Sequence, residues 1–351
     1  MSGLSVMIPT FRRPESFLRA ARSVLRQVGL ANPPQLVAID NSPEGSAAQA
    51  FAALRQETTA PLVLLHESRP GVANARNAGM SATHGALVAF LDDDEEAPPH
   101  WLAALLAVQR QTGADAVFGP VQARLANDAI PHKAYVERLY TRAGPQQSGP
   151  SHRYYGIGNS LLRRETMLAA SAPFSLEANE KGGEDDMLFS WAHAAGRRFA
   201  WAAEAVVIEH IPPERANLAY AMKRAFAFGQ GPCEAAFAAE PKQWGAIAAH
   251  MALGGAQATL CGAVAGAAFL AGSPARYWFL DKAVRGAGKL VWWRPRLFYG
   301  EALARESALA SPPASMSGGS PLSQANAGRL PSKTMTDRLM HRSGAADRGR
   351  S

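Results

Sequence analysis

The first 125 residues alternate short apolar runs with longer amphipathic stretches. A short apolar run bounded by turn residues is typical of a buried strand, and apolar positions spaced three and four apart are typical of a helix. On this basis five runs are predicted to be strands: 4–8, 35–40, 62–67, 86–91 and 115–121. Helices are predicted between them, the first beginning at Pro14. This alternation predicts an α/β fold, a mainly parallel sheet flanked by helices.

The pattern changes twice further along the chain. Up to residue 213 it is less regular, with predicted helices at 132–142 and from Glu184, a loop at 143–151, and strands at 157–164 and 205–210. Residues 214–300 read as helices rich in Ala, Gly and Trp, whereas the following residues are rich in Ser, Gly, Pro and Arg. We therefore predict an α/β domain over 1–213, a helical region over 214–300 and a disordered tail over 301–351.

Composition and charge exclude several classes of protein. The formal charge of +7 suits an anionic partner, but the basic residues gather beside tryptophans near the C-terminus, so no nucleic-acid partner is expected. Cys233 and Cys261 give no disulfide framework, and no signal peptide precedes the first strand, which favours a cytoplasmic location. A G-x-G-x-x-G turn after the first strand and a Walker lysine motif are both missing, which argues against dinucleotide and P-loop enzymes.

Three aspartates, Asp92 to Asp94, directly follow the predicted strand at 86–91, and two glutamates follow them. Ligands of open α/β sheets bind beyond the carboxyl ends of the strands, which is where this run lies. Carboxylates this close repel one another unless water or a cation compensates their charge. The run is either a solvated cap of the next helix or a site for Mg²⁺ or Mn²⁺, and we favour the cation because one aspartate would suffice as a cap.

Two further sets of polar residues have alternative interpretations. Asp40 and His210 also close predicted strands, and would share one sheet edge with the acidic run if those strands were parallel. Asp40 is either a turn residue or an acceptor for a base or ribose, and His210 is either a packed strand-end histidine or a third metal ligand. Glu184, Asp185 and Asp186 begin a predicted helix after two glycines, and either cap it or serve the site.

Taken together, these segments resemble the inverting glycosyltransferases of family 2, which have the fold called GT-A. The similar segments follow one another over about 210 residues: 6–27, 37–42, 69–95, 156–164 and 174–215. The resemblance implies that Pro9, Thr10 and Arg13 line a nucleotide pocket. It also implies that Asp40 binds the base, uracil in the commonest members, and that Arg76 contacts the nucleotide; a solvated helix arginine is the alternative for Arg76.

The same resemblance assigns the acidic residues. Asp92 and Asp93 would contact the nucleotide sugar, and Asp94 and Asp92, with His210 as a further contact, would hold a divalent cation, Mn²⁺ or Mg²⁺, on the donor diphosphate. Glu184 and Asp185 match the family's E-D pair, with Asp185 as the general base that activates an acceptor hydroxyl. Because Asp186 follows directly, it remains an alternative base. A catalytically silent nucleotide-sugar-binding or scaffold protein is the alternative function.

The helical region has a membrane signal. Residues 246–271 carry no formal charge, are long enough to cross a bilayer, and place small residues at every fourth position from Gly254 to Gly266. A basic stretch with Trp278, Trp292 and Trp293 follows. We expect a helix that lies on or dips into the cytoplasmic leaflet, with a lipid-linked or polysaccharide acceptor; the alternative is an Ala-rich subdomain packed on the α/β domain.

Overall fold

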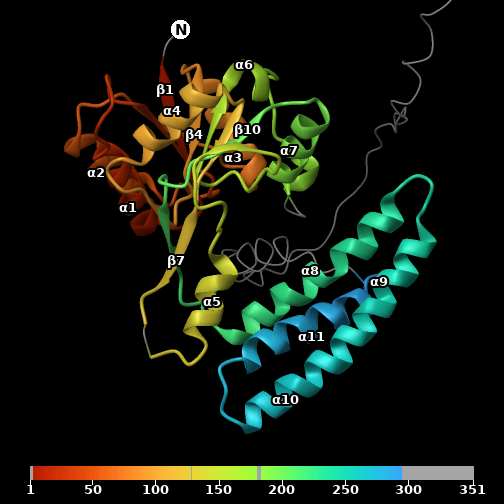
Figure 1. Ribbon diagram of the computed structural model, residues 1–351. Helices are drawn as coiled ribbons and strands as arrows, with labels where there is room; N and C mark the ends of the chain where they lie inside the picture. Colours follow the sequence, from red (N-terminus) through yellow and green to blue (C-terminus); the bar gives the residue numbers. More distant parts are fainter. Residues whose placement is uncertain (1–2, 128, 180–182, 295–351) are drawn as a thin grey trace, which may run out of the picture. The chain divides into compact units, whose positions relative to one another are not determined.

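The computed structural model describes residues 3–127, 129–179 and 183–294 (Figure 1). Contacts divide the chain into two units, Met1–Leu309 and Ala310–Ser351, and every described residue belongs to the first unit. The predicted tail over 301–351 lies outside the described residues.

The core of the α/β part is an eight-stranded sheet. In spatial order its strands are β3 (Leu62–His66), β2 (Gln35–Asp40), β1 (Leu4–Thr10), β4 (Leu87–Phe90), β9 (Ser160–Arg163), β6 (Ala116–Phe118), β10 (Phe199–Trp201) and β8 (Gly149–Ser151). β1 to β4 are mutually parallel, as are β6 and β10. β9 runs antiparallel to both β4 and β6, and β8 runs antiparallel to β10. The predicted α/β fold with a large, mainly parallel sheet is confirmed.

Two hydrophobic clusters cover the two faces of this sheet. The helices are α1 (Pro14–Leu25), α2 (Ala48–Glu57), α3 (Val72–Ala82), α4 (Trp101–Thr112), α6 (Arg164–Met167) and α7 (Glu184–Ala194), with a 3₁₀ turn at Leu176–Ala178. Val6 and Ile8 of β1 pack with α1, α2 and α4, whereas Met7 packs with α3 and α7. Successive strand residues point to opposite faces, so this alternation gives a three-layer arrangement.

A second, three-stranded sheet lies apart from the first and corrects one expectation. β11 (Val207–Ile211) pairs in parallel with β7 (Val121–Leu125) and antiparallel with β5 (Glu95–Glu96). The expectation that the strand at 205–210 would share an edge with the main sheet is therefore wrong. β8 also falls in the predicted loop at 143–151; its sequence Gly-Pro-Ser carries no strand signal, and its pairing with β10 alone makes it a strand.

The C-terminal described residues are helical. They comprise α8 (Leu218–Ala238), α11 (Arg276–Leu290) and one continuous helix made of α9 (Trp244–Ala256), a π-helical turn (Gln257–Cys261) and α10 (Gly262–Leu270). A methyl group on Gly254 would lie 2.8 Å from the carbonyl oxygen of Gly286 in α11, so the first part of the small-residue stripe permits close packing of two helices. Nothing lies within 4 Å of such a methyl group on Gly266.

The helix Trp244–Leu270 stands out by its exposure. Its 27 residues include a window of mean hydropathy 1.4, of which 11% is buried, so by length and composition it could cross a membrane. A buried core helix of a soluble protein can have the same length and hydropathy, but this helix is largely exposed. Towards its C-terminal end, Leu260 is 68% exposed, Phe269 69% and Leu270 88%.

Candidate active site

A cavity of about 580 Å³ opens at the carboxyl edge of the main sheet. β1 contributes Pro9 and Thr10, and the segment after β4 contributes Asp92 to Asp94. Because β9 is antiparallel to β4, its first residue Ser160 pairs with Phe90, and the preceding loop at 156–158 reaches the same edge. The strand order thus brings together segments that are far apart in the sequence.

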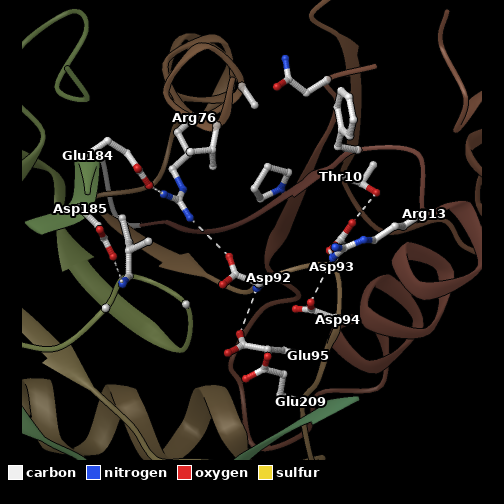
Figure 2. A pocket seen from close by; sticks show the side chains of 18 of the residues that line it. Thr10, Arg13, Arg76, Asp92, Asp93, Asp94, Glu95, Glu184, Asp185 and Glu209 are labelled. Atoms are coloured by element: carbon white, nitrogen blue, oxygen red, sulfur yellow. Dashed lines mark hydrogen bonds and ion pairs between the residues drawn. The ribbon is translucent and has the colours of Figure 1, made fainter. Parts of the chain in front are cut away.

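Nine of the predicted site residues line this cavity, and two do not. The nine are Pro9, Thr10, Arg13, Arg76, Asp92, Asp93, Asp94, Glu184 and Asp185. In the view of Figure 2, Glu184 and Asp185 lie on one side, Thr10 and Arg13 on the other, and Asp92 between them. Asp40 and His210 are the two that the structure does not bring to the cavity.

Asp93 and Asp94 are held by a basic side chain from the start of α1. The Thr10 hydroxyl donates to Oδ2 of Asp93 at 2.8 Å, and Nη1 of Arg13 lies 3.2 Å from Oδ1 of Asp93 and 3.1 Å from Oδ2 of Asp94. Arg215 approaches the same Oδ2 of Asp94 at 3.4 Å. Burial and then the charge of Asp94 raise the pKa of Asp93 to about 6. This end of the cavity therefore holds two buried carboxyl groups paired with two guanidinium groups.

Arg76 forms a buried ion pair with the first residue of α7. Its Nη1 donates to Oε1 of Glu184 in a short contact, and its Nη2 lies 3.4 Å from Oδ1 of Asp92. The side chains of Arg76 and Glu184 are only 6% and 7% exposed, so the alternative of a solvated helix arginine is wrong. Burial raises the pKa of Glu184, a change that the charge of Arg76 opposes. Arg76 thus links α7 to the acidic run.

Of the neighbouring carboxylates Asp185 and Asp186, the first lines the main cavity and the second does not. Oδ2 of Asp185 accepts the backbone N–H of Ile157 at 3.1 Å, and Oδ1 accepts the N–H of Asp186 at 2.9 Å. Asp185 lines the main cavity, whereas Asp186 is exposed and lies outside it. The geometry therefore favours Asp185 over Asp186 as the carboxylate that faces the main cavity.

Asp40 has the turn role that its sequence context left open. One of its carboxylate oxygens accepts the N–H and the hydroxyl of Ser42 at 2.9 and 2.7 Å, and the other accepts the N–H of Ala47 at 2.6 Å. The next residue, Asn41, lines the cavity instead. Asn41 accepts the N–H of Gly71 at 2.8 Å and donates to the carbonyl oxygens of Glu67 and Arg69, so it fixes the loop before α3.

The His210 N–H donates to the carbonyl oxygen of Asp94 at 2.8 Å, so its backbone adjoins the acidic run, but the alternation of β11 turns its side chain away from the cavity. Its Nε2 lies 2.9 Å from Oε2 of Glu96, away from the cavity, while the preceding Glu209 lines the cavity. Sequence reasoning missed Glu209, although period-two alternation could have placed it opposite to His210. Burial and then the charge of Asp94 raise the pKa of Glu209 to about 8.

The chemistry of the cavity lining fits a hard divalent cation shared with a diphosphate. Seven carboxyl groups and five guanidinium groups line it, so oxygen ligands for a hard cation and cationic partners for phosphate oxygens are both present. Among the described residues no three His, Cys, Asp or Glu side chains converge as a metal-binding group. Mg²⁺ commonly takes only one or two carboxylates and completes its shell with substrate phosphates and water, so Asp92 and Asp94 suffice.

The helical region also contributes to the cavity, which sequence reasoning did not predict. Tyr220 and Arg224 of α8 line it, together with Tyr140 at the end of α5 (Lys133–Tyr140). Arg142 also lines it and donates to the carbonyl oxygens of Gly156, at 2.6 Å, and Gly158, in a shorter contact.

Comparisons with known proteins agree on one family. A model of glycosyl transferase family 2 matches residues 5–168. The succinoglycan biosynthesis protein ExoM of Rhizobium meliloti is 32% identical over 267 residues, which cover 75% of this chain and 84% of ExoM. The glycosyltransferase AglE of Haloferax volcanii is 28% identical over 135 residues, or 38% of this chain and 43% of AglE.

A solved structure has a similar fold. The mannosyltransferase PcManGT from Pyrobaculum calidifontis, in complex with GDP-Man and Mn²⁺, superposes with a TM-score of 0.55 at 19% identity, covering 83% of this chain and 87% of PcManGT. This likeness extends over both the α/β part and a share of the remaining chain. It supports the GT-A fold implied by the sequence.

Proposed function

The chain belongs to glycosyl transferase family 2, and from that premise we propose that it transfers a sugar from a UDP-sugar to a hydroxyl of a lipid-linked or polysaccharide acceptor. As a glycosyltransferase it is an enzyme, so a catalytically silent scaffold is set aside. The observation that carries the proposal is the single cavity that both Asp185 and the Asp92 to Asp94 run line. The relationship to ExoM, a succinoglycan biosynthesis protein, supports polysaccharide synthesis as the setting.

Asp92 and Asp94 would hold Mg²⁺ or Mn²⁺ at the donor diphosphate. When bound, the cation supplies Lewis-acid stabilisation of the departing diphosphate oxygens, worth several kcal/mol. Arg13 orients Asp93 and Asp94 through the contacts at 3.2 and 3.1 Å, and Thr10 holds the second oxygen of Asp93. Pro9, Thr10 and Asn41 line the end of the cavity where the nucleotide would bind.

Asp185 would act as the general base. As the acceptor oxygen attacks the anomeric carbon and the bond to the diphosphate breaks, the acceptor hydroxyl proton passes to the Asp185 carboxylate. The N–H donors of Ile157 and Asp186 fix the orientation of that carboxylate. A single displacement inverts the anomeric configuration, so NMR of the product should show an inverted anomer.

Asp94→Asn should weaken metal-dependent donor binding. Losing a carboxylate ligand should cost at least as much as losing an outer-sphere partner, about 10- to 100-fold in affinity. Calorimetric titration with UDP- and GDP-sugars, in Mg²⁺ and in EDTA, measures the donor affinity. It also shows which nucleobase, uracil or guanine, the protein prefers. Glu96→Gln is the matched control, because Glu96 carries a neighbouring carboxylate that pairs with His210 outside the cavity. Equal binding by Asp94→Asn and the natural chain in Mg²⁺ would contradict the assignment.

A membrane surface is the proposed location of the acceptor. The exposed end of α10, with Phe269 and Leu270, is followed by α11, whose Arg276 guanidinium lies 5.8 Å from the Phe269 ring centroid. Aromatic and aliphatic side chains beside basic ones suit the interface of an anionic leaflet. We therefore propose that the helix Trp244–Leu270 seats the enzyme on the cytoplasmic leaflet.

The double variant Phe269→Glu/Leu270→Glu should reduce flotation with vesicles of anionic phospholipid. Two charges at these exposed positions remove apolar area from the contact and repel the lipid headgroups. Val28→Glu, at a residue 45% exposed in the α/β part, controls for the added charge. Undiminished flotation of the double variant would show that this end of α10 is not the membrane contact.

A further inference from the structure

A second, smaller hollow adjoins the active-site cavity at Asp185. It has a volume of about 250 Å³ and is lined by Tyr154, Tyr155, Gly156, Asp185 and Asp186. Gly156 and Asp185 line both spaces. The carboxylate assigned as general base therefore stands at the boundary between the main cavity and this hollow, which we call the tyrosine hollow.

The two tyrosine rings of the tyrosine hollow are fixed by the hydrophobic core. The Tyr154 ring centroid lies 5.9 Å from that of Phe189 and 6.0 Å from that of Phe199. The Tyr155 ring centroid lies 4.6 Å from that of Trp201. Both tyrosines remain partly exposed. The core thus holds two amphipathic rings rigidly at the rim of the active site, where ligand contact costs little conformational entropy.

The polar groups of the tyrosine hollow suit a saccharide. Sugar rings present C–H faces and hydroxyl edges, and tyrosine offers an apolar ring with a hydrogen-bonding tip. The Tyr154 hydroxyl lies beside Asp186 and Ser190, and Asp186 is an exposed carboxylate able to accept hydrogen bonds from several hydroxyls. The chemistry required to bind an uncharged sugar ring is therefore present.

The proposed reaction requires an acceptor at this boundary. The hydroxyl that attacks the donor must reach Asp185 while the nucleotide sugar fills the main cavity, so the rest of the acceptor has to lie beyond Asp185. We propose that the tyrosine hollow binds the terminal sugar ring of the acceptor, with Tyr154, Tyr155 and Asp186 as specificity-determining residues. This inference rests on the proposed function, and it makes the recognised end of the acceptor a saccharide.

Saturation-transfer difference NMR on the full chain tests the assignment without knowledge of the natural acceptor. The probes are the methyl β-glycosides of glucose, galactose, mannose and N-acetylglucosamine, each with UDP or GDP and Mg²⁺. We expect glycoside signals from the natural chain and weaker signals from Tyr154→Phe, Tyr155→Phe and Asp186→Asn. Each tyrosine variant removes one hydroxyl, and Asp186→Asn replaces an acceptor oxygen by an NH₂ donor and removes the charge, so we expect affinity to fall about two- to tenfold. These variants retain the rings that pack on the core.

Tyr277→Phe is the matched control. Tyr277 lies on α11, accepts a hydrogen bond from Arg276 at 2.9 Å and packs in a different hydrophobic cluster. The inference would be overturned if the glycoside signals were unchanged in all three hollow variants. It would also be overturned if no probe gave a signal while the nucleotide signals persisted. Neither result would count against the proposed function. Absence of nucleotide signals would instead count against the proposed function, because the nucleotide reports on the main cavity.

Discussion

Asp185→Asn is expected to lower the rate of sugar transfer by about 10²- to 10⁴-fold, the usual contribution of general acid–base catalysis. Asparagine preserves the shape of the side chain, and its amide oxygen can still accept the N–H of Ile157. It cannot take up the proton of the acceptor hydroxyl. Donor affinity should change little, because Asp185 is assigned to the acceptor side of the reaction. Initial-rate measurements at saturating acceptor, combined with donor titration, separate the two effects.

Asp186→Asn tests the neighbouring carboxylate, the alternative base, in the same assay. Asp186 carries the same group one residue away but lies outside the main cavity, so its amide variant should retain turnover at saturating acceptor. If the tyrosine hollow binds the acceptor, the KM of the Asp186→Asn variant for the acceptor should rise. If Asp186→Asn lost turnover and Asp185→Asn kept it, the assignment of the base would be reversed. Net retention in the product would remove both residues from that role.

Arg76→Gln is expected to destabilise the folded chain by about 3–5 kcal/mol, the cost of leaving a buried charge without its partner. Glu184 is only 7% exposed, and Arg76 is the guanidinium that contacts it. The pKa of Glu184 is already raised by burial, and without Arg76 it should rise further. The folded variant then favours the protonated acid, so its deficit should shrink as the pH falls through that raised pKa. Urea denaturation at several pH values measures the effect.

Two controls sharpen this stability experiment. Arg22→Gln removes an exposed arginine whose Nη2 lies 2.6 Å from Glu57, and should change stability little because the pair is solvated. The double variant Arg76→Gln/Glu184→Gln removes both charges and should recover much of the loss. A deficit for Arg76→Gln no larger than that for Arg22→Gln would show that the buried pair does not stabilise the fold.

Local signals in the sequence were sufficient for most of the framework. Apolar periodicity located β1 to β4 and the helices between them, position at a strand end pointed to Asp92, and the family resemblance pointed to Thr10. These signals depend only on residues that are close together in the chain, so a single sequence is enough to recognise them. The pairing of Arg76 with Glu184 spans 108 positions and was not readable from either segment alone.

The incorrect and missed predictions share a physical cause. In each case the position of the residue depends on packing against segments that are far away in the sequence. His210 was placed at the sheet edge because its strand ends there in sequence, but β11 pairs with β5 and β7 instead. Asp40 and Asn41 are neighbouring turn residues, and backbone geometry alone decides which of them faces the cavity. Tyr220 and Arg224 were missed because nothing in α8 indicates contact with the α/β part.

The contribution of α8 to the cavity has a consequence for engineering. Tyr220 and Arg224 belong to the helices that lead to Trp244–Leu270, yet they form a wall of the same space as Asp94 and Glu209. The α/β part and the helical part are therefore not interchangeable modules. A chimera joined at Pro212 and Pro213 would line its donor cavity with residues of another protein's α8. The cavity and the membrane-binding helix would therefore have to be redesigned together.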